Sequence, residues 1–263
     1  MNLTFFKYQG TGNDFVMIDN REGKLTGVFS QEQIAFLCDR RFGIGADGFI
    51  LLSPAEDCDF RMIYFNSDGR ESTMCGNGGR CLVAFAFDRG IRREVYRFEA
   101  VDGLHEATLE KGIVSLEMIQ PRDFRRLDES AWWLNTGSPH YVRFSNQPVA
   151  EINVYEEGKT IRYSPDFAAT GGTNVNFVNI LSPDRLKVRT YERGVEDETF
   201  SCGTGVTACA YTHLFTQTSG LSKVVVETKG GTLAVEVLKI GTPQERVFLQ
   251  GPARFVFKGE INL

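Results

Sequence analysis

Two short stretches of the chain share an unusual arrangement of cysteine and glycine. Residues 74–80 read MCGNGGR and residues 201–207 read SCGTGVT. Each therefore places a cysteine, a glycine, a polar residue and a second glycine before a run of small and apolar residues. The glycines permit a sharp backbone turn, and the run that follows is typical of a buried helix. We predict two such helices, the first starting near Asn77.

The segments in front of these two stretches also repeat in one order. TNVNFVNI (173–180) aligns with TGNDFVMI (11–18), and LKVRTYERG (186–194) resembles FRMIYFNSDG (60–69) as a strand that ends in a turn. Short apolar strands can resemble one another by chance, but three matches in the same order favour a duplicated chain. We therefore predict an α+β fold of two pseudo-symmetric homologous halves. Each half is expected to be a curved, mainly antiparallel sheet or barrel around a central helix, with the active site in the cleft between the halves.

Capping residues, glycines and short apolar runs elsewhere in the sequence predict the other helices and strands. A helix is expected over 31–41, because Ser30 is a good N-cap, Gln33 completes a capping box and Gly43 ends the periodic run. Strands are expected on both sides of a Gly-rich turn near the N-terminus, at 48–53, 59–65 and 95–119, and in a hairpin through Gly230 and Gly231. The polar segment 120–130 is the candidate linker. We place the N-terminal half at 1–119, with 251–263 packing back on it, and the C-terminal half at 120–250.

Composition excludes several classes of protein. The 263 residues are 42% hydrophobic and 24% charged with a net charge of −5, which predicts a packed core and argues against a dedicated nucleic-acid surface. No stretch approaches the roughly 20 apolar residues of a membrane helix, and the N-terminus does not resemble a signal peptide. We therefore expect a cytoplasmic protein whose six cysteines are free thiols. Neither the cysteines nor the three histidines have metal-ligand spacing, so no metal is expected.

A cysteine at the start of a helix has altered chemistry. Unpaired N–H groups and a partial positive charge stabilise its thiolate, and its pKa can fall from about 8.5 into the range of about 3.5–7.5. The same N–H groups can hold a carboxylate or a phosphate. One cysteine beside glycine is more often a small core residue, but two at equivalent places indicate a shared functional site at Cys75 and Cys202. The other cysteines are expected to be structural: Cys38, Cys58, Cys81 and Cys209.

Several reactions use cysteine, but few require two separated helix starts. Thioredoxin-like exchange uses a single Cys-x-x-Cys turn, and a cysteine nucleophile needs only one sulfur. Inversion of a stereocentre needs a base on one face and an acid on the other, so a thiolate and a thiol that exchange roles satisfy it. The two helix starts would also stabilise the charge that develops on an α-carboxylate. We favour this two-base epimerisation.

The motifs then point to a known family. The stretches GTGNDF, RFGIGADG, FNSDG, MCGNGGR, TGSPHYV, TNVNFV, YERG and CGTG run in order from residue 10 to residue 205. As an ordered set they resemble the diaminopimelate epimerase family, whose members epimerise an amino acid without pyridoxal phosphate. The resemblance implies conversion of LL-2,6-diaminopimelate to the meso isomer, for lysine and peptidoglycan precursors, with no cofactor.

The resemblance also implies roles for individual residues. Cys75 and Cys202 would be the acid–base pair, and His140 and Glu192 would help to set their protonation. Arg193 would bind the distal carboxylate of the substrate through a charge-assisted hydrogen bond. The remaining residues are expected to bind the substrate: Asn13, Asn66, Gly76, Asn77, Asn174, Glu192, Gly203 and Thr204. Without the resemblance, the polar residues among these read as ordinary turn or loop residues.

Two departures from the family pattern concern the distal end of the substrate. Ser138 stands where many members carry an asparagine that contacts substrate, and Gly48 stands where some carry a glutamine. A racemase of another amino acid, related to proline racemase, therefore stays open, although that family typically reads Cys-Gly-His where this chain has Asn77. A non-catalytic binding module or a thiol redox sensor is the alternative from another class. The expected partner is a small-molecule amino-acid substrate, with no nucleic acid and no membrane, and a homodimer is one expectation, although the sequence leaves the oligomeric state open.

Overall fold

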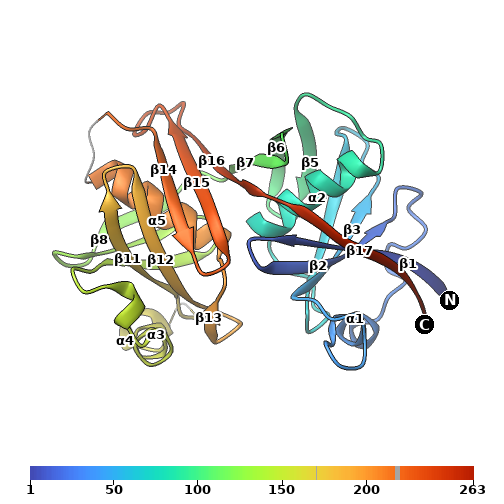
Figure 1. Ribbon diagram of the computed structural model, residues 1–263, viewed down its shortest axis with the longest axis horizontal. Coiled ribbons are helices and arrows are strands. Elements are labelled where there is room, and N and C mark those ends of the chain that lie inside the picture. The colour runs from blue at the N-terminus through green and yellow to red at the C-terminus, as the bar shows by residue number, and fades with distance from the viewer. Residues whose placement is uncertain (170, 217–219) are drawn as a thin grey trace. The chain divides into compact units, whose positions relative to one another are not determined.

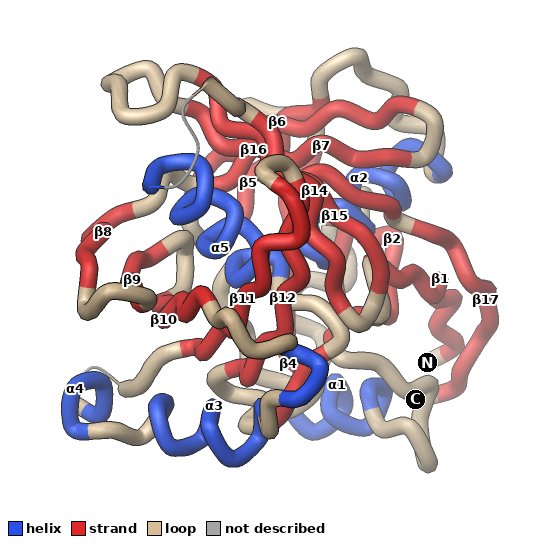
Figure 2. The backbone as a smooth tube through the Cα atoms, turned by 60° about the vertical axis from the view of Figure 1, so that its left-hand side comes forward, coloured by secondary structure: helices blue, strands red, loops and turns tan. Residues whose placement is uncertain are grey.

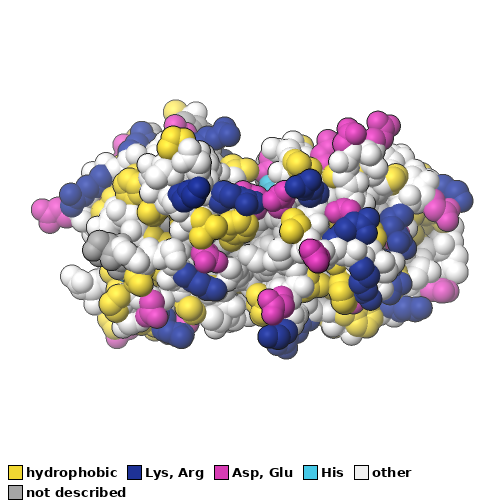
Figure 3. Space-filling view, turned by 90° about the horizontal axis from the view of Figure 1, so that it is seen from above, with side chains coloured by type: hydrophobic (Ala, Val, Ile, Leu, Met, Phe, Trp, Pro, Cys, Tyr) yellow, Lys and Arg dark blue, Asp and Glu magenta, His cyan; other side chains and the backbone are white. Residues whose placement is uncertain are grey.

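The structure of the protein is a computed structural model, and it describes residues 1–169, 171–216 and 220–263. The chain divides into two compact units, which are Met1–Leu116 with Gly251–Leu263, and Glu117–Gln250. Each unit combines strands with a few helices, so the predicted α+β class is confirmed (Figure 1). Within the described residues, no helix is long and apolar enough to cross a membrane. Basic and acidic side chains are interspersed over the face seen in Figure 3.

The first unit contains ten strands and helices that run from β1 to β7 and finish with β17. They are β1 (Asn2–Gly10), β2 (Asn13–Asp19), α1 (Gln31–Cys38), β3 (Gly48–Ser53), β4 (Phe60–Asn66), α2 (Gly76–Asp88), β5 (Tyr96–Ala100), β6 (Gly103–Glu110), β7 (Ile113–Met118) and β17 (Arg254–Asn262). The C-terminal strand β17 pairs antiparallel with β1, so the two chain ends lie side by side in Figure 1.

The second unit contains the elements from β8 to β16. They are β8 (Arg122–Arg126), β9 (Ala131–Asn135), β10 (Pro139–Phe144), the 3-10 helix η1 (Val149–Glu151), α3 (Val154–Arg162), α4 (Pro165–Ala168), β11 (Asn174–Ser182), β12 (Arg185–Glu192), β13 (Asp197–Thr199), α5 (Gly203–Thr216), β14 (Lys223–Thr228), β15 (Gly231–Leu238) and β16 (Arg246–Pro252). Figure 2 shows these elements with helices in blue and strands in red.

The two units follow one pairing order. In the first, β17, β1, β2, β3, β4, β5, β6 and β7 pair successively, and only β2–β3 and β4–β5 are parallel. In the second, β8, β9, β10, β11, β12, β14, β15 and β16 pair in the same sense, again with two parallel steps, β10–β11 and β12–β14. Helices α2 and α5 occupy the same place in this order, after β4 and after β12.

This order corrects one part of the predicted repeat. The strand at 173–180 corresponds to β3 rather than to the strand at 11–18, because both β3 and β11 follow a helix and pair parallel with the strand before it. The strand at 11–18, now β2, corresponds instead to β10. The alignment of those two strands was wrong, since short runs of Val, Ile and Phe carry too little information to fix a register. The other parts of the predicted repeat agree with the structure: β4 corresponds to β12, and α2 corresponds to α5.

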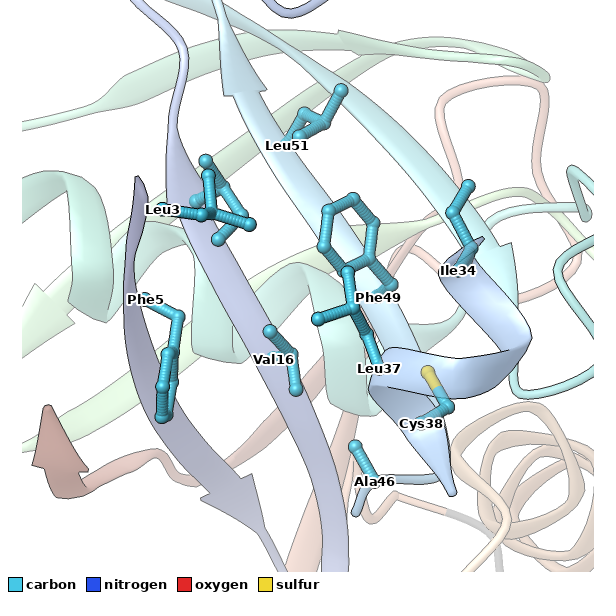
Figure 4. Packing of buried hydrophobic residues seen from close by; sticks show 10 residues of the cluster. Leu3, Phe5, Val16, Ile34, Leu37, Cys38, Ala46, Phe49 and Leu51 are labelled. Atoms are coloured by element: carbon cyan, nitrogen blue, oxygen red, sulfur yellow. The ribbon is translucent and has the colours of Figure 1, made fainter. Parts of the chain in front are cut away.

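In the first unit, strand β1 separates two layers of core. Leu3 and Phe5 pack with Val16, Phe49 and helix α1, as Figure 4 shows. On the opposite face of β1, Phe6 and Tyr8 contact the ring of Phe85 on α2. Residues 76–86 of α2 are all buried, so α2 is the central helix of this unit.

In the second unit, strand β11 has the same two-sided arrangement. Val175 and Phe177 belong to the core cluster beneath α3. The alternate residues Asn174 and Asn176 are also buried, and Asn176 faces α5 where Gly205 leaves room for its side chain. A buried strand therefore presents amides, rather than hydrocarbon, to the central helix of the unit.

Two predicted elements differ in extent from the structure. The helix predicted over 31–41 begins as expected at Gln31 with the full Ser30–Gln33 capping box, but it ends at Cys38. It stops there because Asp39 is extended and its carboxylate accepts hydrogen bonds from the backbone N–H of Arg41 and of Phe42, both at 2.7 Å.

The segment 120–130 was predicted to be a linker, and this was wrong for its first part. It contains strand β8, which pairs antiparallel with β9. The guanidinium groups of Arg125 and Arg126 lie over the rings of Trp133 and Trp132. The charged side chains of this segment suggested a solvated linker. Arginine, however, stacks well on aromatic faces and so can form part of a sheet.

Candidate active site

The first cysteine predicted to be catalytic sits at the start of the central helix of the first unit. Cys75 is the N-cap of α2, and its carbonyl accepts the first intrahelical hydrogen bond, from Gly79 N–H at 2.7 Å. The N–H groups of Gly76, Asn77 and Gly78 belong to the first turn and have no partner inside the helix. Cys75 thus stands beside a group of backbone donors that suits an anion.

A line of polar side chains joins Cys75 to its neighbours. Its Sγ lies 3.6 Å from Asn13 Oδ1, and Asn13 Oδ1 also accepts a hydrogen bond from Asn77 Nδ2 at 3.2 Å. Asn13 Nδ2 donates to Asp47 Oδ2 at 2.7 Å, and Asn77 Oδ1 accepts from the Arg80 guanidinium at 3.0 Å. The structure therefore brings Asn13 and Asn77 together with Cys75.

Arg80 is a buried cation that the sequence analysis did not single out. It is 0% exposed and donates to Gly76 O, Thr11 Oγ1 and Asn77 Oδ1. Within the described residues no carboxylate forms an ion pair with it. Burial lowers its pKa to about 10, and the opposing charges that act on it are those of Cys81 and Cys75. A signal for it was available, since it is the one charged residue between Cys75 and Asp88.

The second cysteine occupies the same place in the second unit. Val206 N–H donates to Cys202 O at 2.8 Å, so Cys202 immediately precedes α5 as Cys75 precedes α2. Its Sγ lies 3.4 Å from Thr204 Oγ1, and Thr204 Oγ1 lies 2.9 Å from His140 Nε2. Cys202, Thr204 and His140 are therefore one connected group.

His140 is completely buried, and its surroundings keep it neutral. Burial, together with the nearby charge of Arg193, lowers the pKa of His140 to about 3. Its other ring nitrogen, Nδ1, lies 3.2 Å from Asn176 Nδ2. Asn176 in turn contacts Tyr141 O at 2.9 Å and accepts from Thr190 Oγ1 at 2.9 Å. Asn176 was missed by the sequence analysis, although two asparagines at alternate positions of an apolar strand, Asn174 and Asn176, are a detectable pattern.

Asn174 braces the loops that surround this group. Its Nδ2 donates to Ser138 Oγ at 2.7 Å and to Pro139 O at 2.9 Å, and its Oδ1 accepts from Arg193 N–H at 2.8 Å. Ser138 and the turn that follows β12 are therefore held by one amide. Since both ends of that amide bind protein, Asn174 is suited to positioning its neighbours.

The turn after β12 carries the two charged residues that were expected to hold the distal end of a substrate. Within the described residues, the Arg193 guanidinium forms no hydrogen bond or ion pair, and it is half-buried. Glu192 accepts a hydrogen bond from Thr199 Oγ1 at 2.8 Å. The carboxylate of Glu196 stabilises the turn, because it accepts hydrogen bonds from Arg162, from Tyr163 Oη and from Gly194 N–H.

Asn66 and Gly48 lie at the paired ends of β4 and β3. Asn66 is exposed, and its Oδ1 accepts from Tyr64 Oη at 3.0 Å. Its known contacts thus belong to the β4 turn, and none of them joins it to the line of polar side chains beside Cys75. A Cβ at Gly48 would lie 2.6 Å from the Tyr64 ring and 2.8 Å from the Phe65 carbonyl oxygen, so a longer side chain there needs both Tyr64 and the backbone of β4 to move.

All six cysteines are free thiols. Burial raises the pKa of Cys38 and of Cys81 to about 12 and that of Cys209 well above its usual value, which suits a structural role. No group of three or more histidine, cysteine or acidic residues in the described part of the chain could hold a metal ion.

Similarity to known proteins identifies the family of this chain. A family model described as diaminopimelate epimerase matches residues 5–116 and 132–256. The chain belongs to the diaminopimelate epimerase family. It is 48% identical to the diaminopimelate epimerase of Flavobacterium psychrophilum, covering 98% of this chain and 100% of that one. It is 45% identical to that of Chlorobaculum tepidum, covering 97% and 99% of the two chains.

Solved structures show how widely this fold occurs. A Bacillus anthracis phenazine biosynthesis protein of the PhzF family superposes with a TM-score of 0.77 at 14% identity, covering all of both chains. A probable proline racemase from Agrobacterium radiobacter gives 0.73 at 15% identity, covering 99% of this chain and 93% of that one. At such identities the likeness concerns the fold alone.

Membership of the diaminopimelate epimerase family makes the chain an isomerase that carries out an epimerisation. The predicted family is therefore confirmed. The roles of the individual residues stay predictions, as does the placement of the site in a cleft between the halves.

Proposed function

We propose that the protein converts LL-2,6-diaminopimelate to meso-diaminopimelate by removing a proton from one face of Cα and adding a proton to the other. The observation that carries this proposal is the repeated half-site. Cys75 and Cys202 each precede the central helix of a unit, and each has its sulfur within hydrogen-bonding distance of a polar side chain. Together with the family membership, this arrangement supports a two-base mechanism without a cofactor.

The reaction balances with the two sulfurs alone. The thiolate of one cysteine takes the Cα proton, and the electron pair left on Cα delocalises into the α-carboxylate. The thiol of the other cysteine then gives its proton to the opposite face, so one thiol and one thiolate exchange roles. The N–H groups at the starts of α2 and α5 would stabilise the developing charge, with Gly76, Asn77, Gly203 and Thr204 supplying them.

Recognition of the distal end is assigned to the turn after β12. The Arg193 guanidinium would form a charge-assisted hydrogen bond to the distal carboxylate, and Glu192 would accept from the distal ammonium. Asn13 and Asn66 are also proposed to bind polar groups of the substrate. Ser138 leaves the detailed fit of the distal end to experiment.

The direct test is isomerisation of purified, reduced protein with LL-diaminopimelate, followed by chiral chromatography. Meso-diaminopimelate should form, and proline and trans-4-hydroxyproline should stay unchanged. Turnover of proline in place of diaminopimelate would favour the racemase alternative. Failure to isomerise any amino acid would leave a binding module or a redox sensor.

Substitution of each sulfur separates the catalytic cysteines from the structural ones. Cys75→Ser and Cys202→Ser should each lose more than about a hundredfold in kcat, since each removes one of two required acid–base groups. Cys58→Ser is the matched control and should keep wild-type activity, because Cys58 lies in a loop and, among the described residues, its thiol donates only to Phe60 O. Near-normal activity of either Cys75→Ser or Cys202→Ser would contradict the two-base mechanism.

The proposal includes a homodimer in the cytoplasm, where the thiols stay reduced. Strand β17 pairs with β1, and Val256 and Phe257 on it are 52% and 44% exposed. An antiparallel pair of β17 strands centred on Phe257 would place Arg254 opposite Glu260 of the second copy. Light scattering should report a dimer that Val256→Asp dissociates and that the control Val101→Asp, on an exposed turn, does not. A monomeric wild-type protein would contradict this.

A further inference from the structure

The turn that carries Arg193 holds another residue in an unfavourable backbone conformation. Glu196 has a φ of 60°, in the left-handed region that residues with a Cβ rarely adopt. Gly194 in the same turn has a φ of 93°, which glycine adopts without strain. A strained residue persists only where its surroundings hold it, and such residues are concentrated at functional sites. The contacts of Glu196 show what holds it here.

The carboxylate of Glu196 is surrounded by hydrogen-bond donors. Arg162 Nη2 lies 2.7 Å from one of its oxygens, and Arg162 Nε lies 3.1 Å from both. The other donors are Tyr163 Oη at 2.8 Å, Tyr191 Oη at 3.3 Å and Gly194 N–H at 2.9 Å. A carboxylate only accepts, so it satisfies all of these donors, whereas an amide of the same size has one accepting oxygen and cannot.

Arg162 joins this turn to a second loop. It is the last residue of α3, it is 9% exposed, and its Nη1 donates to Gly171 O at 2.7 Å. A Cβ at Gly172 would lie 1.5 Å from the same nitrogen, so glycine is needed there to leave room for the guanidinium. These two glycines precede Asn174, at the start of β11. One buried guanidinium therefore fixes both the turn after β12 and the loop before β11.

Both of these segments hold the backbone on either side of Arg193. Asn174 Oδ1 accepts from the backbone N–H of Arg193 at 2.8 Å. The backbone N–H of Glu196 donates to Glu192 O at 2.8 Å, which closes the turn across Arg193. The Arg193 guanidinium, by contrast, forms no hydrogen bond or ion pair within the described residues. The turn is therefore rigid in its backbone and open at one cationic side chain.

The ion pair also affects the charge around Arg193. Burial, together with the nearby charge of Arg162, lowers the pKa of Arg193, and Glu196 opposes this effect. Loss of the Glu196 charge would by itself make the turn more positive and strengthen its attraction for an anion. Loss of the hydrogen bonds would instead loosen the turn and weaken binding. Because these two effects have opposite signs, an experiment can separate them.

We propose that Arg162 and Glu196 are positioning residues, which hold Arg193 in the conformation that binds the distal carboxylate of the substrate. This inference rests on the proposed function, since it concerns the recognition assigned there to Arg193. Arg162 and Glu196 act through the backbone of the turn. The strained backbone of Glu196 is then maintained because it fixes where the Arg193 side chain leaves the turn.

Hydrogen exchange of the ligand-free protein tests whether the carboxylate holds the turn. Exchange at the Gly194 N–H is measured by mass spectrometry with fragmentation to single residues. Glu196→Gln should raise its rate at least about tenfold, because the acceptors of the turn are lost. Glu157→Gln is the matched control and should keep the wild-type rate, since Glu157 likewise pairs with an arginine, Arg143, at 2.5 Å. Equal rates in wild type and Glu196→Gln would overturn the proposal.

Kinetics with diaminopimelate separate positioning from charge and from stability. Glu196→Gln and Glu196→Asp should both raise KM about tenfold with a smaller change in kcat, since the first loses the charge and the second loses the reach of the carboxylate. A role through charge alone predicts a lower KM for Glu196→Gln and no change for Glu196→Asp. A merely structural role predicts a lower melting temperature with an unchanged KM. Either of these results would contradict the proposal, and Glu196→Asp decides it if Glu196→Gln does not fold.

Combination with Arg193→Gln identifies the residue through which Glu196 acts. In the Arg193→Gln background, Glu196→Asp should leave KM unchanged, because the side chain that it positions is gone. A further rise of about tenfold would show that Glu196 acts elsewhere and would refute the positioning role. An unchanged KM in Arg193→Gln itself would overturn the distal recognition in the proposed function and this proposal with it. An unchanged KM in the Glu196 variants alone would overturn only the positioning role, so the two failures are distinguishable.

Discussion

Gly205→Ala should damage the Cys202 half-site far more than its small size suggests. A Cβ at residue 205 would lie 2.5 Å from Asn176 Oδ1 and 3.4 Å from Cys202 Sγ. Asn176 would have to move, which breaks its hydrogen bonds to His140, Tyr141 and Thr190. Three buried hydrogen bonds at about 1 kcal/mol each, less about 1 kcal/mol gained in helix propensity, give a loss of about 2 kcal/mol. Such a loss lowers the melting temperature by about 4–8 °C in a protein of this size.

The matched control lies at the same place in the other unit. Gly78→Ala puts a Cβ 3.0 Å from Ile50 Cδ1 and 3.2 Å from Met62 Cε, which are the ends of flexible apolar side chains. Melting temperature and diaminopimelate turnover should both be measured for the two variants. Gly205→Ala should be the less stable of the two and should lose at least about tenfold more in kcat, because the group that holds Cys202 and Thr204 is displaced. Equal behaviour of the two variants would refute the importance assigned to Asn176.

Two further predictions concern the turn after β12. Arg193→Gln should raise KM for diaminopimelate by about tenfold to a hundredfold with a smaller change in kcat, because a charge-assisted bond to the distal carboxylate is lost; an unchanged KM would show that Arg193 does not bind substrate. Burial opposes ionisation of Glu196, but its hydrogen bonds to Arg162 and its neighbours outweigh this and lower its pKa to about 2. The stability that Glu196 contributes is therefore present above about pH 4.5 and lost as pH falls towards 2, so the difference in melting temperature between wild type and Glu196→Gln should shrink over that range. A difference that does not vary with pH would contradict this.

Prediction from the sequence was most successful for features that depend on residues close together in the chain. The capping box at Ser30, the glycine turns and the two Cys-Gly starts each act within a few residues, and the structure has them at the predicted positions. The early end of α1 at Cys38 also has a local cause, the hydrogen bonds of the Asp39 side chain. It could not be predicted, because this side chain could equally have pointed to solvent.

The parts that could not be predicted depend on contacts between distant segments. Arg80 reaches Thr11, and Asn176 on β11 joins His140 on β10 to Thr190 on β12, so their roles follow from strand pairing and not from their neighbours in the sequence. The register of the repeat failed for the same reason. Strands β2 and β11 look alike as sequences, and only the parallel pairing of β11 with β10 shows that its counterpart is β3.

The most direct test of the two-base account is the fate of the Cα hydrogen in heavy water. Protonated LL-diaminopimelate is converted by the protein in deuterated buffer, stopped at low conversion, separated by isomer and analysed by mass spectrometry. The account predicts that the meso product carries one deuterium at the inverted carbon while the remaining LL substrate is still unlabelled, because different sulfurs remove and deliver the proton. Protium retained at the inverted carbon of the product, or equal labelling of substrate and product from the start, would point to a single base and contradict the account.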